Sequence, residues 1–197
     1  MFDPVSIIKA VGYIGLCGII FAESGLFFGF FLPGDSLLFT AGFLASQGFM
    51  NIYVLVPLLF IAAVLGNNVG YAFGYRIGPA FFNKQDSFFY KKGYIEKTEK
   101  YFQKYGGKTI VIARFIPVVR TFATILAGIA KMDYKNFVFY NIVGAFLWTV
   151  GLTVLGYFLG NTIPNIDRYI VPMVLVIIVV SILPGLWQLF SMLRSRK

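Results

Sequence analysis

Four ionisable side chains interrupt long apolar stretches of the sequence: Glu23, Asp35, Arg114 and Arg120. The two acids are twelve residues apart and the two bases are six residues apart, and each pair lies beside a proline. A charged side chain within a membrane costs about 2.5–3.5 kcal/mol on insertion scales, so such residues are expected to face protein or water and to mark a transport pathway. Their opposite signs predict that the two pairs neutralise one another if folding brings them together.

The two arginines are suited to bind an anion. Arg120 follows Pro117 in the first turn of a predicted half-helix, whose free N–H groups and positive dipole end favour negative charge. Arg114 lies on the other side of this break and could complete a clamp, since a guanidinium binds phosphate through parallel hydrogen bonds. The pattern therefore favours a phosphorylated headgroup as the ligand. Polar side chains that could assist are Thr121, Ser36, Asn67 and Asn68, although such residues also serve helix packing.

Glu23 and Asp35 need a different role, because ionised carboxylates do not bind phosphate. We expect them to carry protons, or to release the arginines by competing for them. The alternative is purely structural ion pairing between two hairpins, with Asp35 as a helix cap and Arg114 extending to the membrane interface. Desolvating two charges can cost more than their attraction returns, so a buried ion pair is a poor source of stability and we favour function.

The composition indicates an integral membrane protein. Of the 197 residues, 58% are hydrophobic and only 13% are charged, against about 25% in globular domains. The mean hydropathy is +0.79. The chain has no histidine and one cysteine, Cys17, which argues against disulfides, Cys/His metal sites and histidine-dependent catalysis. No nucleophile–base pair is recognisable, so we expect a transporter without a metal or cofactor rather than an enzyme.

The elements that position the four charges are of two kinds. Uninterrupted apolar stretches at 52–75, 133–160 and 169–193 reach the ~20 residues that a transmembrane helix requires. Segments 5–50 and 108–131 are apolar but broken, the first at Pro33 and Gly34 and the second at Pro117. Proline lacks the N–H that helix bonding needs and glycine frees the backbone, so each segment is expected to form a re-entrant hairpin.

The distribution of basic residues predicts the orientation. The formal net charge is +9, with eight basic residues in segment 76–108 and Arg194, Arg196 and Lys197 at the end of the chain. The positive-inside rule puts both regions in the cytoplasm, with an amphipathic surface helix within 94–105. Anionic lipid headgroups are compatible partners and nucleic acid is not expected. The N-terminus could lie on either side, depending on whether residues 5–32 cross fully.

Short similarities suggest an internal repeat. Phe31-Leu32-Pro33 corresponds to Phe115-Ile116-Pro117, and Met50-Asn51 corresponds to Met132-Asp133. A half that contains one hairpin and one crossing must be inverted relative to its copy, as in several transporters with midplane sites. The predicted fold is therefore a single all-α membrane domain over residues 1–197. It consists of an inverted repeat of re-entrant hairpin plus transmembrane helix, followed by a C-terminal transmembrane helix.

The residues around the charges resemble the DedA family, also called SNARE-associated or VTT-domain membrane proteins. The stretch from Glu23-Ser24-Gly25 to Phe31-Leu32-Pro33-Gly34-Asp35 is similar to its first motif. The stretch Ala113-Arg114-Phe115-Ile116-Pro117-Val118-Val119-Arg120-Thr121 is similar to its second. The resemblance implies two oppositely oriented hairpins, residence in the bacterial cytoplasmic membrane and a role in moving lipids.

The resemblance also implies a substrate class. Bacterial members are linked to the return of undecaprenyl phosphate and to dependence on proton motive force, and eukaryotic relatives scramble phospholipids. We therefore expect a polyprenyl-phosphate flippase whose partners are membrane lipids and protons, with Arg114, Arg120 and Thr121 at the headgroup and Glu23 and Asp35 as gates. A proton-coupled cation antiporter, a non-specific scramblase, a non-transporting scaffold and a homo-oligomer remain open.

Overall fold

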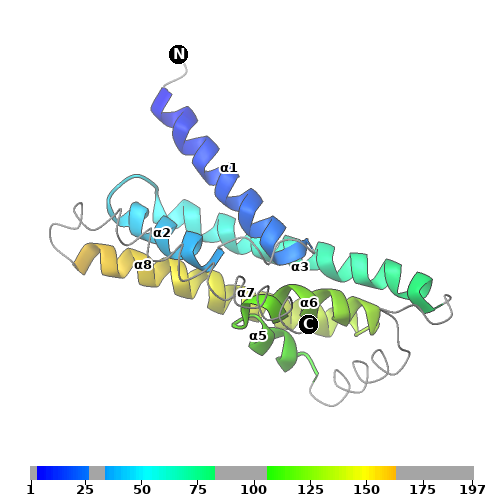
Figure 1. Ribbon diagram of the computed structural model, residues 1–197. Helices are drawn as coiled ribbons and strands as arrows, with labels where there is room; N and C mark the ends of the chain where they lie inside the picture. The colour runs from blue at the N-terminus through cyan, green and yellow to red at the C-terminus, as the bar shows by residue number, and fades with distance from the viewer. Residues whose placement is uncertain (1–3, 27–33, 83–105, 163–197) are drawn as a thin grey trace, which may run out of the picture.

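The computed structural model describes residues 4–26, 34–82 and 106–162, which form helices without any strand (Figure 1). Three predictions fall outside these residues: the break at Pro33, the amphipathic helix within 94–105 and the C-terminal helix 169–193.

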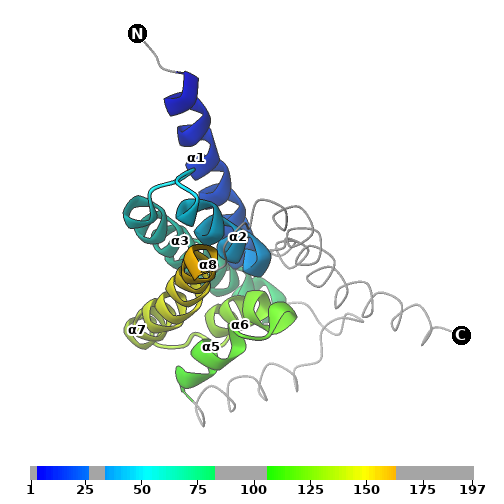
Figure 2. The same cartoon turned by 90° about the vertical axis from the view of Figure 1, so that its left-hand side faces the viewer.

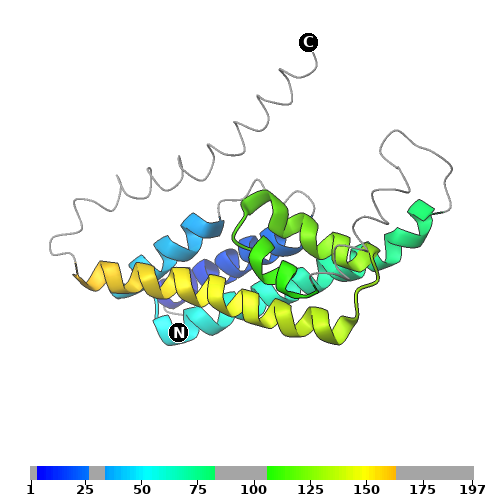
Figure 3. The ribbon, with the colours of Figure 1, turned by 90° about the horizontal axis from the view of Figure 1, so that it is seen from below.

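Two long helices form the centre of the fold. The first is α3 (Ile52–Phe82), and the second combines α7 (Tyr134–Ala145), the π-helical turn η2 (Phe146–Val150) and α8 (Gly151–Thr162). They lie side by side in opposite directions (Figure 3). Ile52–Ile77 and Tyr134–Thr162 are long and apolar enough to cross a membrane, which confirms the two predicted helices in this part of the chain. The expected loop from residue 76 begins too early, because α3 continues to Phe82.

Four shorter helices pack around this pair: α1 (Pro4–Gly25), α2 (Gly34–Ser46), α5 (Lys108–Ala113) and α6 (Pro117–Ile129). The predicted break in segment 108–131 is present, since α5 ends at Ala113 and Pro117 opens α6. Proline suits this first helical position because no N–H is needed there. Helices α2 and α6 have 13 residues each, which is too short to cross a membrane.

The two 13-residue helices, α2 and α6, are the half-helices of the fold, and they contact opposite ends of the pair of long helices. Helix α2 packs along α8, whereas α6 packs along α3 (Figures 1 and 2). Glycines allow both close approaches, because an added Cβ would overlap a backbone carbonyl of the facing helix. These pairs are Gly42 with Thr153, Gly156 with Phe39, Gly128 with Tyr71, and Gly74 with Ile125. At both helix–helix contacts, each helix contributes a glycine and the backbone carbonyl of the residue three positions before that glycine. The α2–α8 and α6–α3 contacts therefore use equivalent positions.

The surface is apolar and much of the polarity is inside. Large hydrophobic side chains along the long helices are exposed, among them Phe73, Phe139 and Phe158. Buried polar and charged residues include Glu23, Asn67, Arg114, Arg120, Asn141, Thr149 and Thr153. Water-soluble proteins rarely bury charges in such numbers, whereas membrane proteins direct their few charges toward the protein interior. This distribution is typical of a protein with lipid as its outer solvent.

Candidate functional site

The candidate site lies where the ends of four short helices meet, beside the middle of the long pair. Glu23 is in the last turn of α1 and Asp35 is the second residue of α2. Arg114 caps the C-terminus of α5, and Arg120 is in the first turn of α6. The four charges, which span almost a hundred residues of sequence, are thereby collected at one place.

Arg120 forms ion pairs with both acids. Its Nη1 donates to Oδ1 of Asp35 at 2.7 Å, and its Nη2 donates to Oε1 of Glu23. Glu23 is fully buried and Arg120 is 8% exposed, whereas the side chain of Asp35 is 42% exposed. Asp35 is therefore the carboxylate that water or a ligand can reach first.

Gly34 allows Glu23 to approach the start of α2. A side-chain carbon at Gly34 would overlap the Glu23 carboxylate. The carboxylate consequently lies against the N-terminal end of α2, where the helix dipole stabilises negative charge. The predicted helix-breaking glycine thus also makes room for the buried acid.

Arg114 is buried among neutral groups. Its Nη1 donates to the backbone carbonyl and to Oδ1 of Asn141, both at 3.2 Å. When the amide oxygen of Asn67 is turned toward Arg114, it accepts a hydrogen bond from Nη2 of Arg114 at 2.8 Å. In this orientation the amide nitrogen of Asn67 donates to the backbone carbonyl of Ser24 at 2.8 Å. Among the described residues no carboxylate lies within salt-bridge distance of Arg114. Its charge is offset there by dipoles, which leaves it attractive to an anion.

Trp148 joins the two arginines to Asp35. Its indole N–H donates to Oδ1 of Asp35 at 2.6 Å, and the guanidinium of Arg120 lies 4.7 Å from the centre of its ring. The guanidinium of Arg114 is 5.4 Å from the same ring. Both distances suit cation–π attraction. Trp148 lies in η2, and single π-helical turns are frequent at functional sites.

A small cavity separates the arginines. It is lined by Ser24, Asn67, Ile110, Arg114, Arg120 and Thr124. Its volume of about 10 Å³ suits roughly one water molecule. The Nε of Arg120 is buried and has no hydrogen-bond partner in the described part of the chain. The cavity must therefore widen before it can hold a phosphate group.

The remaining predicted residues differ in their relation to this site. Asn67 belongs to it, whereas Asn68 donates to the carbonyl of Val64 and accepts from Tyr134. Ser36 is buried in α2. Pro117 opens α6, whereas the side chain of Thr121 and the whole of Pro33 lie outside the described residues.

Sequence reasoning missed Trp148 and Asn141. The available signal was chemical, because an Asn and a Trp N–H both need hydrogen-bond partners within an apolar transmembrane stretch. Their partners lie on other helices, at Asp35 for Trp148 and at Arg114 for Asn141.

Comparisons with known proteins identify the family. The sequence profile of the VTT domain matches residues 32–158. An uncharacterised membrane protein of Mycobacterium leprae is 46% identical over 178 residues, which cover 90% of this chain and 79% of that protein. Protein DedA of Escherichia coli K12 is 44% identical over 179 residues, which cover 90% and 81% of the two chains. Inner membrane protein YqjA of the same strain is 37% identical over 150 residues, which cover 76% and 68%.

No solved structure matches this chain. The profile match and the relatives together show that the chain belongs to the DedA family of VTT-domain membrane proteins.

Proposed function

We propose that the protein is a flippase that moves a phosphorylated lipid carrier, such as undecaprenyl phosphate, across the bacterial cytoplasmic membrane with the help of proton motive force. The observation that carries the proposal is the unequal pairing of the two buried arginines. Arg120 is held by both Glu23 and Asp35, whereas Arg114 has only neutral partners among the described residues. Two adjacent guanidinium groups, one of them in exchangeable ion pairs, are suited to receive a phosphate.

The proposed mechanism is an exchange of anions on Arg120. Protonation of Glu23 and Asp35 would remove their charge and release Arg120, and the phosphate would take their place. Replacing one buried anion by another avoids leaving a cation unpaired in a medium of low dielectric constant, which is the costly outcome. Asp35 is the more exposed acid and would exchange first. The prenyl chain would stay in the bilayer while the headgroup crosses.

We infer that the chain forms an inverted repeat, with α1–α2 and α5–α6 as re-entrant hairpins that enter from opposite faces. Three observations support this arrangement. Helices α2 and α6 are too short to cross, they begin near the same central site, and their crossings with α8 and α3 use equivalent glycines. The basic segment 76–108 and the C-terminus are assigned to the cytoplasm, on the positive-inside rule.

The ion pairs argue against a cation antiporter. Both candidate cation ligands, Glu23 and Asp35, face the guanidinium of Arg120, whose charge would repel a bound cation. A non-specific scramblase would use the same path for the headgroup. It differs from the proposed flippase because its transport should not depend on a proton gradient or on the lipid.

The test is transport of a labelled polyprenyl phosphate in vesicles that contain the purified full chain. We expect Arg120→Ala to slow transport at least tenfold, which corresponds to about 1.4 kcal/mol of lost interaction. Lys135→Ala, which removes an exposed positive charge at the start of α7, is the matched control and should stay within twofold of the parent. Transport by Arg120→Ala at the parental rate would disprove the clamp.

Proton coupling is tested in the same vesicles with an imposed pH gradient. Glu23→Gln and Asp35→Asn should each abolish the response of the transport rate to the gradient, because an amide cannot exchange a proton. A full response in the double variant would assign proton coupling to other groups.

A further inference from the structure

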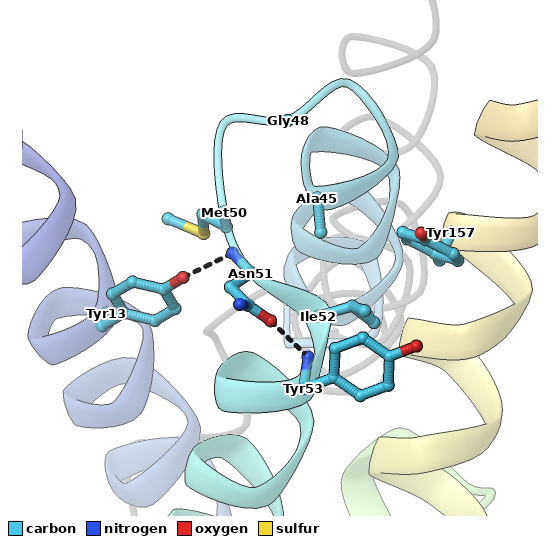
Figure 4. Close-up of a pocket in the computed structure, with 8 residues that line it drawn as sticks. All are labelled: Tyr13, Ala45, Gly48, Met50, Asn51, Ile52, Tyr53 and Tyr157. Atoms are coloured by element: carbon cyan, nitrogen blue, oxygen red, sulfur yellow. Dashed lines mark hydrogen bonds between the residues drawn. The ribbon is translucent and has the colours of Figure 1, made fainter.

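Within the described residues, two open pockets lie at the turns that connect each half-helix to the next long helix. One surrounds the α2–α3 turn and has a volume of about 360 Å³ (Figure 4). The other surrounds the α6–α7 turn and has a volume of about 400 Å³. It is lined by Tyr71, Tyr75, Lys131, Met132, Asp133 and Tyr134. Neither pocket includes any of the four central charges.

Each turn has one residue in the left-handed region of the backbone, at the same distance from the end of the preceding helix. Gly48 follows the end of α2 by two residues and has a φ of +80°, and Lys131 follows the end of α6 by two residues and has a φ of +47°. Glycine is the usual residue at this left-handed position after a helix, because it has no Cβ to strain. The second turn therefore carries a lysine where the first turn has the unstrained choice.

Non-glycine residues in this conformation cluster at functional sites, which makes the side chain of Lys131 a candidate for a role in binding. Lys131 is exposed and lines the pocket beside the rings of Tyr75 and Tyr134, which are 49% and 54% exposed. Tyr71 fixes the floor of the pocket, since its hydroxyl donates to the carbonyl of Met132 at 2.5 Å and its ring stacks on Phe137. The pocket thus combines one exposed cation with three tyrosine rings, of which Tyr71 is held by a hydrogen bond and by ring stacking.

We place the pocket near a boundary between membrane and water. One candidate transmembrane segment begins at Tyr134, and Tyr75 in the other long helix is followed directly by Arg76. Tyrosine is enriched at the level of the lipid headgroups, where its ring meets acyl chains and its hydroxyl meets water. A ligand in this pocket would therefore be reached from the headgroup region.

We propose that this pocket binds the phosphate of a membrane lipid, with Lys131 on the phosphate and the tyrosine rings against the adjoining part of the lipid. Asp133 is compatible with an anion here, because its Oδ1 accepts from the backbone N–H of Asn136 at 3.0 Å as the cap of α7. The positive end of the α7 dipole offsets part of its charge. The site is separate from the central arginines, and its occupancy does not depend on transport.

Equilibrium binding to the purified full chain in detergent tests this site, with phosphatidic acid and diacylglycerol as probes that differ only in the phosphate. The parent should bind phosphatidic acid at least tenfold more tightly. Lys131→Gly should weaken that binding about fivefold without lowering the unfolding temperature, because glycine adopts the left-handed conformation of this position without strain. Lys135→Gln removes a nearby exposed charge outside the pocket, and it should change binding less than twofold.

Each of the following results would overturn the proposal. The first is unchanged affinity of Lys131→Gly for phosphatidic acid, and the second is an equal loss in Lys135→Gln, which would indicate a diffuse surface charge. The third is displacement of phosphatidic acid by an equal concentration of inorganic phosphate, which would identify a site for the free ion. In an Arg120→Ala background the loss caused by Lys131→Gly should persist. If this loss of affinity vanished in the Arg120→Ala background, the result would show that phosphatidic acid binds at the central arginines instead.

Discussion

At the scale of single residues, the two arginines of the site differ in the neighbours that hold them. Arg120 is bound to two carboxylates, and Arg114 is bound to amide and carbonyl oxygens. Trp148 contacts both guanidinium groups through its ring and Asp35 through its N–H. Trp148 is therefore placed to position the charges relative to one another.

Substitutions of Trp148 can separate its two contacts. Trp148→Phe keeps a ring for the arginines and removes the hydrogen bond to Asp35, so we expect transport to fall about threefold. Trp148→Leu removes both contacts and should cost more than tenfold, since cation–π attraction contributes roughly 0.5–2 kcal/mol.

The measurement is the initial transport rate in vesicles with equal amounts of each variant. Equal transport rates for Trp148→Phe and Trp148→Leu would show that the contact between the ring and the arginines does not contribute to transport. Parental rates for both variants would show that Trp148 has no role in transport.

At the scale of helices, the site depends on two close crossings. Helix α2 reaches α8 and helix α6 reaches α3 only because glycines face backbone carbonyls at both contacts. Close approach through small residues is a general device of membrane helices, where burial of apolar surface gives no drive for association. The N-terminal ends of α2 and α6, which carry Asp35 and Arg120, are held in register by these contacts.

A single methyl group at a crossing should therefore be costly. Gly156→Ala would push the new Cβ into the carbonyl of Phe39, and we expect it to lower the free energy of unfolding by about 2 kcal/mol, as overpacking typically does. Gly151→Ala is the matched control, because nothing lies within 4 Å of its added Cβ. The control should be neutral or slightly stabilising through its higher helix propensity.

Unfolding in a mixed detergent series measures both glycine variants. Equal stability of Gly156→Ala and Gly151→Ala would contradict the close packing of α2 on α8.

At the scale of the whole molecule, the turns that follow α2 and α6 each connect a short helix to a long one, in the two proposed halves of the chain. If the halves are inverted in the membrane, Gly48 and Lys131 lie on opposite sides of it. Both residues are exposed, so each can be replaced by cysteine without entering the core.

Labelling of these positions tests the inversion. In a Cys17→Ser background, Gly48→Cys and Lys131→Cys should react with a membrane-impermeant thiol reagent from opposite sides of the membrane. Labelling of both from the same side of intact cells would disprove the inverted repeat.

The sequence alone determined the apolar surroundings of the protein, the break at Pro117 and the choice of the four charged residues. The high hydropathy favours lipid, Pro117 opens a helix and Gly34 frees the backbone. Each of these effects depends only on neighbouring residues in the chain, so it can be predicted from the sequence. The family also followed from short motifs around the four charges, and the comparisons confirm it.

Only the tertiary structure decided which charges meet. The bonds from Arg120 to Asp35, from Arg120 to Glu23 and from Trp148 to Asp35 join residues that are 85, 97 and 113 positions apart. Such pairings depend on how α1, α2 and α6 approach the long helices, and no local pattern encodes that geometry. For this reason Glu23, Asp35, Arg114 and Arg120 could be chosen from the sequence, whereas the sharing of Arg120 by both acids, the neutral shell of Arg114 and the part played by Trp148 could not.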